Sequence, residues 1–168
     1  MIIMDYGGKS PDIAADAFIA PNAAVIGDVV IGAQSSIWFA CTLRGDGNYI
    51  RIGAHTNIQD GTVIHVDSAS LPTIIGDHVT VGHMALIHAC TLENGSFVGM
   101  AATVMDGAVV ETGAMVAAGA LVTPGKRVPA GELWAGSPAR KWRDLTDHER
   151  ATLTDAAAHY VELARGYL

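Results

Sequence analysis

The sequence has only two cysteines, no cluster of basic residues and no long hydrophobic run. Cys41 and Cys90 are too few for a disulfide scaffold, so we expect both to be buried, reduced thiols. A formal net charge of −7 without a Lys/Arg cluster argues against nucleic acid binding. Glycine or aspartate interrupts each apolar run too early for a membrane span, and MIIMDYGGKS is unlike a secretion signal. We therefore expect a soluble, cytoplasmic protein with no membrane or nucleic acid partner.

What the sequence does have is a hydrophobic repeat with a period of six residues. The spacing is regular except after Leu43, Ile64 and Ile87. The repeat positions are Ile13, Ile19, Val25, Ile31, Ile37, Leu43, Ile52, Ile58, Ile64, Ile75, Val81, Ile87, Leu92, Val98, Val104, Val110, Val116, Val122, Val128 and Trp134. A small or β-branched residue follows most of them four positions later, and Gly, Asn and Asp are frequent where the chain must turn.

A six-residue period is too short for a β-meander and has the wrong spacing for an amphipathic helix. It is typical of a parallel β-helix with a triangular cross-section, in which three strand-and-turn units make one coil. With 168 residues and 50% hydrophobic content, we expect one domain over residues 1–168, with the β-helix at 10–138. A helix should follow at 146–166, because Thr146 and Glu149 can form a capping box at its start.

The breaks in the repeat decide which residues lie above one another in neighbouring coils, ~4.8 Å apart. We expect the extra residues after Leu43 and Ile64 to form loops, beyond which the coil resumes. One column of outward side chains then contains Arg44, His65, His88 and Met105, and a second contains Asp60, His83 and Met100. His55 and His78 stack away from both columns, and we expect them to be surface residues.

His65 and His88 are therefore predicted to lie close enough to share one metal ion. His83 should lie roughly 10 to 16 Å from His88, because nearly extended chain and a corner separate them. Ligand nitrogens lie ~2.0 Å from a zinc ion, so His83 and His88 of one chain cannot bind the same zinc. If three chains pack around a threefold axis, His83 of one chain can face His65 and His88 of the next.

From about residue 13 to residue 138 the sequence resembles the hexapeptide-repeat proteins, which fold as left-handed β-helices. A narrower resemblance, to the γ-class carbonic anhydrases and their short-loop relatives, rests on LRGD at 43–46, NIQDG at 57–61, IH at 64–65 and GHMALIH at 82–88. It implies an all-β fold: a left-handed parallel β-helix of about seven triangular coils, followed by a C-terminal α-helix packed along the prism. It also implies a homotrimer with metal sites at the subunit interfaces.

The resemblance implies a role for each matching residue. The metal ligands are expected to be His65, His83 and His88, and Gln59 is expected to hydrogen-bond a metal-bound hydroxide. Three imidazoles leave a tetrahedral zinc with one open position, where carbonic anhydrases are known to ionise water near neutral pH. We therefore predict reversible hydration of CO2 to bicarbonate, a lyase reaction, with Zn2+ as cofactor and Fe2+ or Co2+ as alternatives.

Further residues of the resemblance have less defined roles. It implies an ion pair between Arg44 and Asp60 across the interface, with Asp46 nearby, which either takes part in catalysis or only holds the trimer together. Tyr160 of the C-terminal helix is the candidate for a tyrosine that reaches the site in some relatives. The columns also place Met100 and Met105 beside the ligands, either as interface packing or as the lining of a substrate entrance.

Two features depart from the best-studied γ-carbonic anhydrases, which have an acidic residue after RGD and a long acidic loop with a proton shuttle. Here Gly47 follows RGD, and the short loop VDSASLPT contains only Asp67 as an acidic residue. Relatives with this reduction have roles that extend to acyl-CoA thioester hydrolysis, so a metal-dependent thioesterase is one alternative. A metal-stabilised trimeric scaffold without turnover is another. A hexapeptide acyltransferase is a weaker candidate, because the RGD and QD motifs argue against it.

Overall fold

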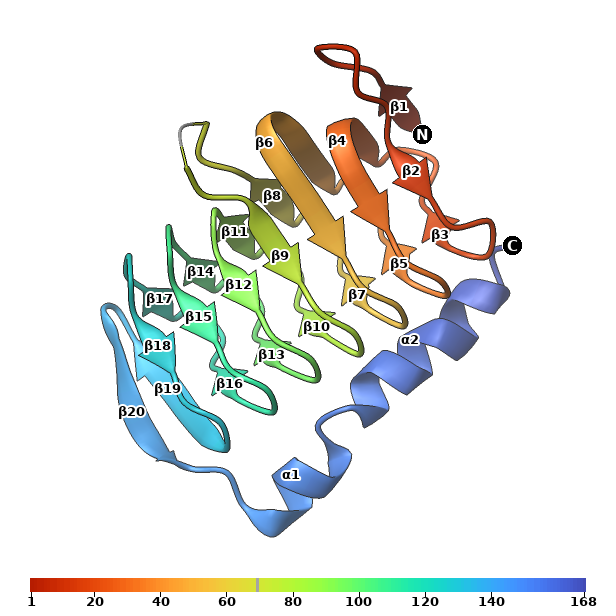
Figure 1. Cartoon of the computed structure of the whole chain (residues 1–168). Helices are drawn as coiled ribbons and strands as arrows, with labels where there is room; N and C mark the ends of the chain where they lie inside the picture. The colour runs from red at the N-terminus through yellow and green to blue at the C-terminus, as the bar shows by residue number, and fades with distance from the viewer. Residues whose placement is uncertain (69) are drawn as a thin grey trace.

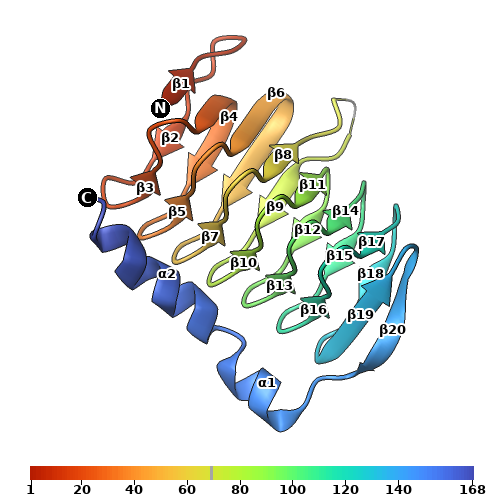
Figure 2. The same ribbon diagram turned by 180° about the vertical axis from the view of Figure 1, so that it is seen from behind.

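A computed structural model describes residues 1–68 and 70–168 of the chain. It shows the expected left-handed parallel β-helix of about seven coils, in which short strands follow one another around a triangular prism (Figure 1). Seen from behind, the coils remain stacked in sequence order while the C-terminal helical segment runs back along one edge (Figure 2). The fold class predicted from the repeat is confirmed.

Three faces make up the prism, and each is a parallel sheet in its main part. The first face holds β1 (Ile2–Met4), β8 (Val63–His65), β11 (Leu86–His88), β14 (Thr103–Val104) and β17 (Leu121–Val122). The second face holds β2 (Asp12–Ile13), β9 (Thr73–Ile75), β12 (Thr91–Leu92), β15 (Val109–Val110) and β18 (Arg127–Val128). Two longer strands, β4 (Ala24–Ile31) and β6 (Thr42–Ile52), run through both of these faces.

The third face ends in an antiparallel pair that closes the last coil. It holds β3 (Phe18–Ile19), β5 (Ser36–Ile37), β7 (Asn57–Ile58), β10 (Thr80–Val81), β13 (Phe97–Val98), β16 (Met115–Val116), β19 (Glu132–Gly136) and β20 (Ala139–Asp144). Strand β20 turns back along β19, so the parallel order ends there.

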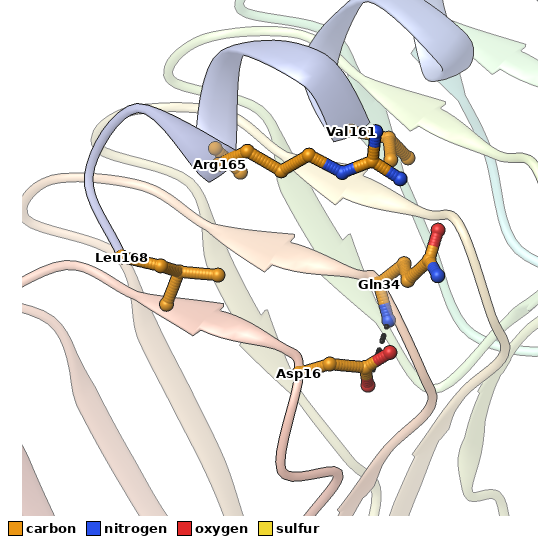
Figure 3. Close-up of a pocket in the computed structure, with 6 residues that line it drawn as sticks. Asp16, Gln34, Val161, Arg165 and Leu168 are labelled. Carbon is orange, nitrogen blue, oxygen red and sulfur yellow. Dashed lines mark hydrogen bonds between the residues drawn. The ribbon is translucent and has the colours of Figure 1, made fainter.

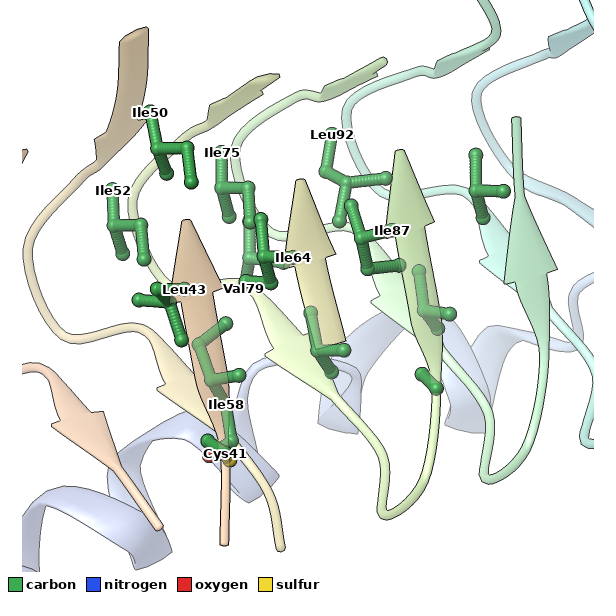
Figure 4. Packing of buried hydrophobic residues seen from close by; sticks show 14 of the residues in the cluster. Cys41, Leu43, Ile50, Ile52, Ile58, Ile64, Ile75, Val79, Ile87 and Leu92 are labelled. Atoms are coloured by element: carbon green, nitrogen blue, oxygen red, sulfur yellow. Dashed lines mark hydrogen bonds between the residues drawn. The ribbon is translucent and has the colours of Figure 1, made fainter. Parts of the chain in front are cut away.

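The repeat positions form the core of the prism. Their side chains are buried except for Ile13 and Trp134 near the two ends, which are half-buried. Leu43, Ile64 and Ile87 are register partners on neighbouring strands, and Figure 4 shows their side chains among the buried aliphatic residues of the prism. Full burial of each such side chain contributes roughly 1.5–3 kcal/mol. The column order predicted from the repeat is therefore confirmed.

One expected loop is a strand instead. The three extra residues after Leu43 belong to β6, which continues around the corner between the first and second faces. The register between β4 and β6 shifts here, so that Gly27 pairs with Gly45 but Val29 pairs with Ile50. A Cβ atom on Gly27 would lie 2.3 Å from the Gly45 carbonyl oxygen, so this close approach of two backbones requires glycine. The insertion is a bulge within a paired strand.

The C-terminal segment forms two helices rather than the one expected over 146–166. The first, α1 (Asp147–Thr152), has the predicted capping box of Thr146 and Glu149. The second, α2 (Asp155–Arg165), buries three small or β-branched side chains against the prism: Ala157, Val161 and Ala164. In the described part of the chain, no helix is long and apolar enough to cross a membrane.

Both cysteines are buried and unpaired, as predicted. Burial raises the pKa of Cys41 to about 11 and that of Cys90 to about 12. Both thiols are therefore protonated near neutral pH and serve as small core residues.

Candidate metal centre

Four side chains from four successive coils form one row on the first face, which we call the Asp46–Asp106 row: Asp46, His65, His88 and Asp106. His65 Nε2 lies 3.0 Å from Asp46 Oδ1, and His88 Nδ1 lies 2.6 Å from Asp106 Oδ1. Between them, His65 Nδ1 and His88 Nε2 are 3.2 Å apart. Strands β8 and β11 position the two histidines, which are register partners as the repeat predicts. Each imidazole thus has a carboxylate on its outer nitrogen and the other imidazole on its inner nitrogen.

The spacing of the two inner nitrogens suits a metal ion. Two nitrogens that each lie ~2.0–2.1 Å from a tetrahedral zinc are about 3.3–3.4 Å from each other. The observed 3.2 Å between His65 Nδ1 and His88 Nε2 is close to that separation. Carboxylates on the outer nitrogens are also the usual support of metal-binding histidines, because they hold the ring and select its tautomer. The row therefore fits two of the three ligands that the resemblance implies.

Asp46 is held as a carboxylate at its end of the row. Burial raises its pKa, but the hydrogen bonds from His65 and Arg44 outweigh this and lower the pKa to about 2. The Arg44 guanidinium forms an ion pair with Asp46, and the Gly47 amide donates to the same carboxylate at 2.9 Å. Asp46 is therefore ionised at neutral pH and can only accept hydrogen bonds.

His83 has a similar support in a different place. It follows β10 at the corner between the third and first faces, and its Nδ1 lies 2.9 Å from Asp60 Oδ2. Among the described residues, no group of three His, Cys, Asp or Glu side chains is placed to hold a metal ion. A centre that contains His65, His83 and His88 therefore needs a second chain.

The predicted pair of Arg44 and Asp60 is not formed within one chain. Arg44 pairs with Asp46, and Asp60 pairs with His83. A contact between Arg44 and Asp60 requires two chains, so it stays a prediction.

Gln59 lies in a buried polar network beside the Asp60–His83 corner. Its side chain is 5% exposed, and its Nε2 donates to Asn57 Oδ1 at 3.0 Å. Asn57 in turn donates from Nδ2 to Thr80 Oγ1 at 2.9 Å. This network orients the Gln59 amide and leaves its carbonyl oxygen as the acceptor that it can offer to a bound group.

Tyr160 lies on the same side of the prism as Asp60. Helix α2 places its ring in a T-shaped contact with Trp38, with centroids 5.2 Å apart. Burial raises the pKa of Tyr160, and the negative charge of Asp60 raises it further. The phenol is therefore protonated near neutral pH and can act as a hydrogen-bond donor.

Apolar side chains surround the two histidine positions. Met84, next to His83 in sequence, is 71% exposed, and Met100, one coil above His83, is 57% exposed. Val63 and Leu86 are exposed on the neighbouring strands β8 and β11. Met105 is half-buried one coil above His88. An exposed apolar surface around a polar centre is typical of a protein interface or a ligand site.

The position after the RGD motif has no room for a side chain. A Cβ atom on Gly47 would lie 2.3 Å from Ser68 Oγ and 2.7 Å from Ser68 Cβ. Ser68 belongs to the short loop after His65, part of which lies outside the described residues. Ser68 thus occupies the space that a side chain at position 47 would need.

Two other features of the surface lie apart from this centre. His55 and His78 stack at the corner between the second and third faces, with centroids 4.8 Å apart and planes at 5°. A small hollow between the end of α2 and the first coils is lined by Asp16, Gln34, Val161, Ala164, Arg165 and Leu168. Figure 3 shows the hydrogen bond that the backbone amide of Gln34 donates to the Asp16 carboxylate there. It contains none of the predicted site residues.

Sequence reasoning missed Asp106 and Asn57. Asp106 follows Met105, which the column count had already placed one coil above His88. Extending that count by one residue toward the corner could have found it. Asn57 precedes Gln59 by two positions, so the alternation of side chains along a strand places both on the same face. That alternation could have indicated the contact between Asn57 and Gln59.

Comparison with known proteins places the chain in a family, although no family model matches it. It is 45% identical to the carbonic anhydrase of Geobacillus kaustophilus, over 99% of this chain and 91% of that protein. It is 53% identical to the mitochondrial γ carbonic anhydrase 2 of Arabidopsis thaliana, over 97% of this chain and 60% of the relative. The chain belongs to the γ-carbonic anhydrase-like family. It spans about 60% of the length of the curated plant relatives that it matches.

Solved structures of hexapeptide-repeat proteins share the fold of this chain. A hexapeptide transferase family protein from Anaplasma phagocytophilum is 51% identical, with a TM-score of 0.96 over 99% of this chain and 98% of that one. The N-acyltransferase AntD of Bacillus cereus has a TM-score of 0.63 at 14% identity, which shows a common fold alone. That distant likeness therefore carries no argument for acyl transfer in this γ-carbonic anhydrase-like chain.

Proposed function

We propose that this chain is a metal-dependent carbonic anhydrase, which hydrates CO2 reversibly to bicarbonate at the interfaces of a homotrimer. The observation that carries the proposal is the Asp46–Asp106 row, in which two imidazoles face each other at 3.2 Å with a carboxylate on each outer nitrogen. The names of the relatives support the same reaction. We propose the cytoplasm as its location, although the plant relatives are named as mitochondrial.

The charges of the proposed centre favour a divalent cation. Asp46, Asp60 and Asp106 carry −3, and Arg44 carries +1, which leaves −2 around three neutral imidazoles. One divalent ion neutralises this charge, and imidazole ligands suit Zn2+ first, with Fe2+ or Co2+ as alternatives. In a cyclic trimer, His83 and Asp60 of one chain complete the row of the next, which gives three identical centres.

The side chains of the centre have separable tasks in this proposal. A metal ion held by His65, His83 and His88 would supply the Lewis acidity that ionises water near neutral pH. The oriented carbonyl oxygen of Gln59 would accept a hydrogen bond from a water or hydroxide in the centre and so orient its lone pair toward CO2. Val63, Leu86 and the exposed methionines form apolar walls that suit CO2 and exclude bulk water. Tyr160 stays protonated and can donate a hydrogen bond to the carboxyl product.

The test is stopped-flow CO2 hydration on protein purified without oxygen and loaded separately with zinc and with iron. We expect hydration that rises with metal content and disappears in His83→Ala. The matched control is His78→Ala, because His78 belongs to a stacked pair outside the centre. A metal-replete trimer with hydration no faster than the buffer blank contradicts the proposal.

Acyl-CoA thioester hydrolysis is the second candidate. Met84 and Met100 present a flexible apolar surface beside His83 that suits an acyl chain. Ser68 leaves no room for an acidic side chain at position 47, and the short loop VDSASLPT replaces the long acidic loop that carries the proton shuttle in the best-studied relatives. Hydrolysis of acyl-CoAs by the metal-loaded protein, without CO2 hydration, would favour this candidate. If neither reaction occurs and chelation still lowers stability, a metal-stabilised scaffold remains.

A further inference from the structure

The far end of the Asp46–Asp106 row lies outside every segment on which the family resemblance rests. Asp106 follows β14, one coil above His88, and no motif of the sequence marks it. Its Oδ1 lies 2.6 Å from His88 Nδ1. The other two contacts between an imidazole and a carboxylate are longer, 2.9 Å for His83 and 3.0 Å for His65. Asp106 therefore makes the shortest such contact in the candidate centre.

The backbone on both sides of Asp106 is tied to the neighbouring coils. The Asp106 carbonyl accepts from the Gly125 amide at 2.8 Å, and the next amide, of Gly107, donates to the Ala89 carbonyl at 2.7 Å. The turn is also closed by a hydrogen bond from the Ala108 amide to the Met105 carbonyl at 3.0 Å. These bonds fix the turn, so the carboxylate is held beside His88 by the coils and does not depend on a flexible loop.

A carboxylate in this place decides which nitrogen of His88 carries the proton. A neutral imidazole has one N–H, and an ionised carboxylate can only accept, so the N–H must be on Nδ1. The lone pair is then on Nε2, which points at His65 Nδ1. Asp46 acts on His65 in the same way from the other end of the row, through Nε2. Two lone pairs 3.2 Å apart repel each other, and a cation between them removes that repulsion.

We propose that Asp106 is a positioning residue of the metal centre, which holds His88 in the Nδ1–H tautomer with its Nε2 available to the metal. The proposal rests on the metal site of the proposed function but not on the reaction catalysed there. Substitution of Asp106 should therefore weaken metal binding. The fold should remain, because Asp106 is half-exposed at a turn and contributes no core side chain.

The test compares Asp106→Asn, Asp106→Ala and Asp106→Glu with Asp77→Asn in the full-length chain. Asp77 is the matched control: it precedes His78 at another turn, but its Oδ1 accepts from the Ala54 amide at 2.7 Å and not from an imidazole. Zinc affinity is measured by competition with a chromophoric chelator, and the coordination of Co2+ by its visible absorption. Nitrogen-15 NMR of the metal-free protein reports which nitrogen of His88 is protonated.

We expect Asp106→Asn and Asp106→Ala to weaken zinc binding by about 10- to 100-fold, the usual effect of losing an outer partner of a metal-binding histidine. Asp106→Glu should restore part of the affinity, and Asp77→Asn should match the wild type. The Co2+ spectrum should change in the Asn and Ala variants alone. In the metal-free wild type His88 should be protonated on Nδ1, and in Asp106→Asn on Nε2, because the amide can donate to Nδ1.

Zinc affinity within twofold of the wild type in both Asp106→Asn and Asp106→Ala, with the same His88 tautomer, overturns the proposal. If the wild type binds no metal, the proposed function fails, but the tautomer still decides the role of Asp106. A His88 that is Nδ1-protonated in the wild type and not in Asp106→Asn then supports it, and an unchanged tautomer rejects it. Thermal melts identify any variant that fails to fold, and the remaining variants then decide.

Discussion

Two pairs of histidines lie on neighbouring coils of this β-helix, His65 with His88 and His55 with His78. Both pairs are 23 residues apart in the sequence, and both bring their rings close, with centroids 5.2 and 4.8 Å apart. The rings of His65 and His88 are tilted by 51° and meet through nitrogens, whereas those of His55 and His78 are parallel within 5°. Stacked coils alone therefore give ring contact, not a chelating arrangement.

The two pairs differ in backbone conformation and in their carboxylates: His55 and His78 have positive φ values, whereas His65 and His88 end strands β8 and β11. Asp46 and Asp106 engage the outer nitrogens of His65 and His88, and this turns the inner nitrogens toward each other. Among the described residues, no carboxylate is hydrogen-bonded or ion-paired to His55 or His78. Asp77, next in sequence to His78, instead accepts from the backbone of Ala54. A β-helix can thus stack histidines without a metal role, and backbone conformation together with the neighbouring acids makes the distinction.

The largest expected effect is the loss of a proposed ligand. His88→Ala should reduce the metal content measured by elemental analysis to an undetectable level and abolish CO2 hydration. The fold should remain, because the prism core is aliphatic and His88 points outward. His78→Ala should change neither quantity. Equal metal content in the two variants would remove the proposed difference between the pairs.

The second-largest effect is expected from metal removal, which should distinguish the two histidine pairs. A metal ion at about 100 times its dissociation constant stabilises the folded state by about 2.7 kcal/mol. Chelation should therefore lower the melting temperature of the wild type and of His78→Ala, as measured by calorimetry. His88→Ala should melt at the same temperature with and without the chelator. A chelator-dependent shift in His88→Ala would locate the stabilising ion elsewhere.

The Asp46 end of the row should matter less than a ligand but more than an ordinary surface acid. Because the pKa of Asp46 is about 2, the carboxylate is an ionised acceptor at neutral pH, and an amide is a weaker one. Asp46→Asn should weaken zinc binding by about 10- to 100-fold in a competition assay. Asp77→Asn provides the comparison and should have wild-type affinity.

The smallest effect is expected at the stacked pair itself. His55 has a φ of 54°, which is unfavourable for any residue that has a Cβ atom. In later coils glycine occupies the same turn position, as at Gly113. His55→Gly should relieve this while removing the ring contact, so the free energy of unfolding in urea should change by less than about 1 kcal/mol. Metal content should be unchanged. A large loss of stability would show that the stack is a structural element of the prism.

Most of the fold could be predicted from the repeat, because each repeat position points into the prism and the coil has no alternative place to bury it. Leu43, Ile64 and Ile87 illustrate this, since their spacing alone gave the register that the strands have. The corner bulge in β6 could not be predicted, because it depends on the approach of Gly27 to Gly45 between two coils. The end of α1 near Thr152 was also missed, since no Gly or Pro marks it in the sequence.

The positions of the three histidines in the candidate centre were predictable, but the carboxylate contacts beside them were not. The column count placed His65 beside His88 and separated His83 from them. It also placed Asp60 next to His83 in the second column, but it did not predict the close contact between their polar atoms, or that Asp106 contacts His88. These contacts depend on rotamers and on the way in which turn residues lean across a corner, and residue spacing alone contains neither.

The contact between Gly47 and Ser68 also constrains how this protein can evolve. An acidic residue at position 47 needs the space that the Ser68 side chain occupies, 2.3 Å from the nearest possible Cβ. A single substitution there is strained unless the loop after His65 changes first or at the same time. A loop that makes room at position 47 must therefore arise before, or together with, an acidic residue after the RGD motif.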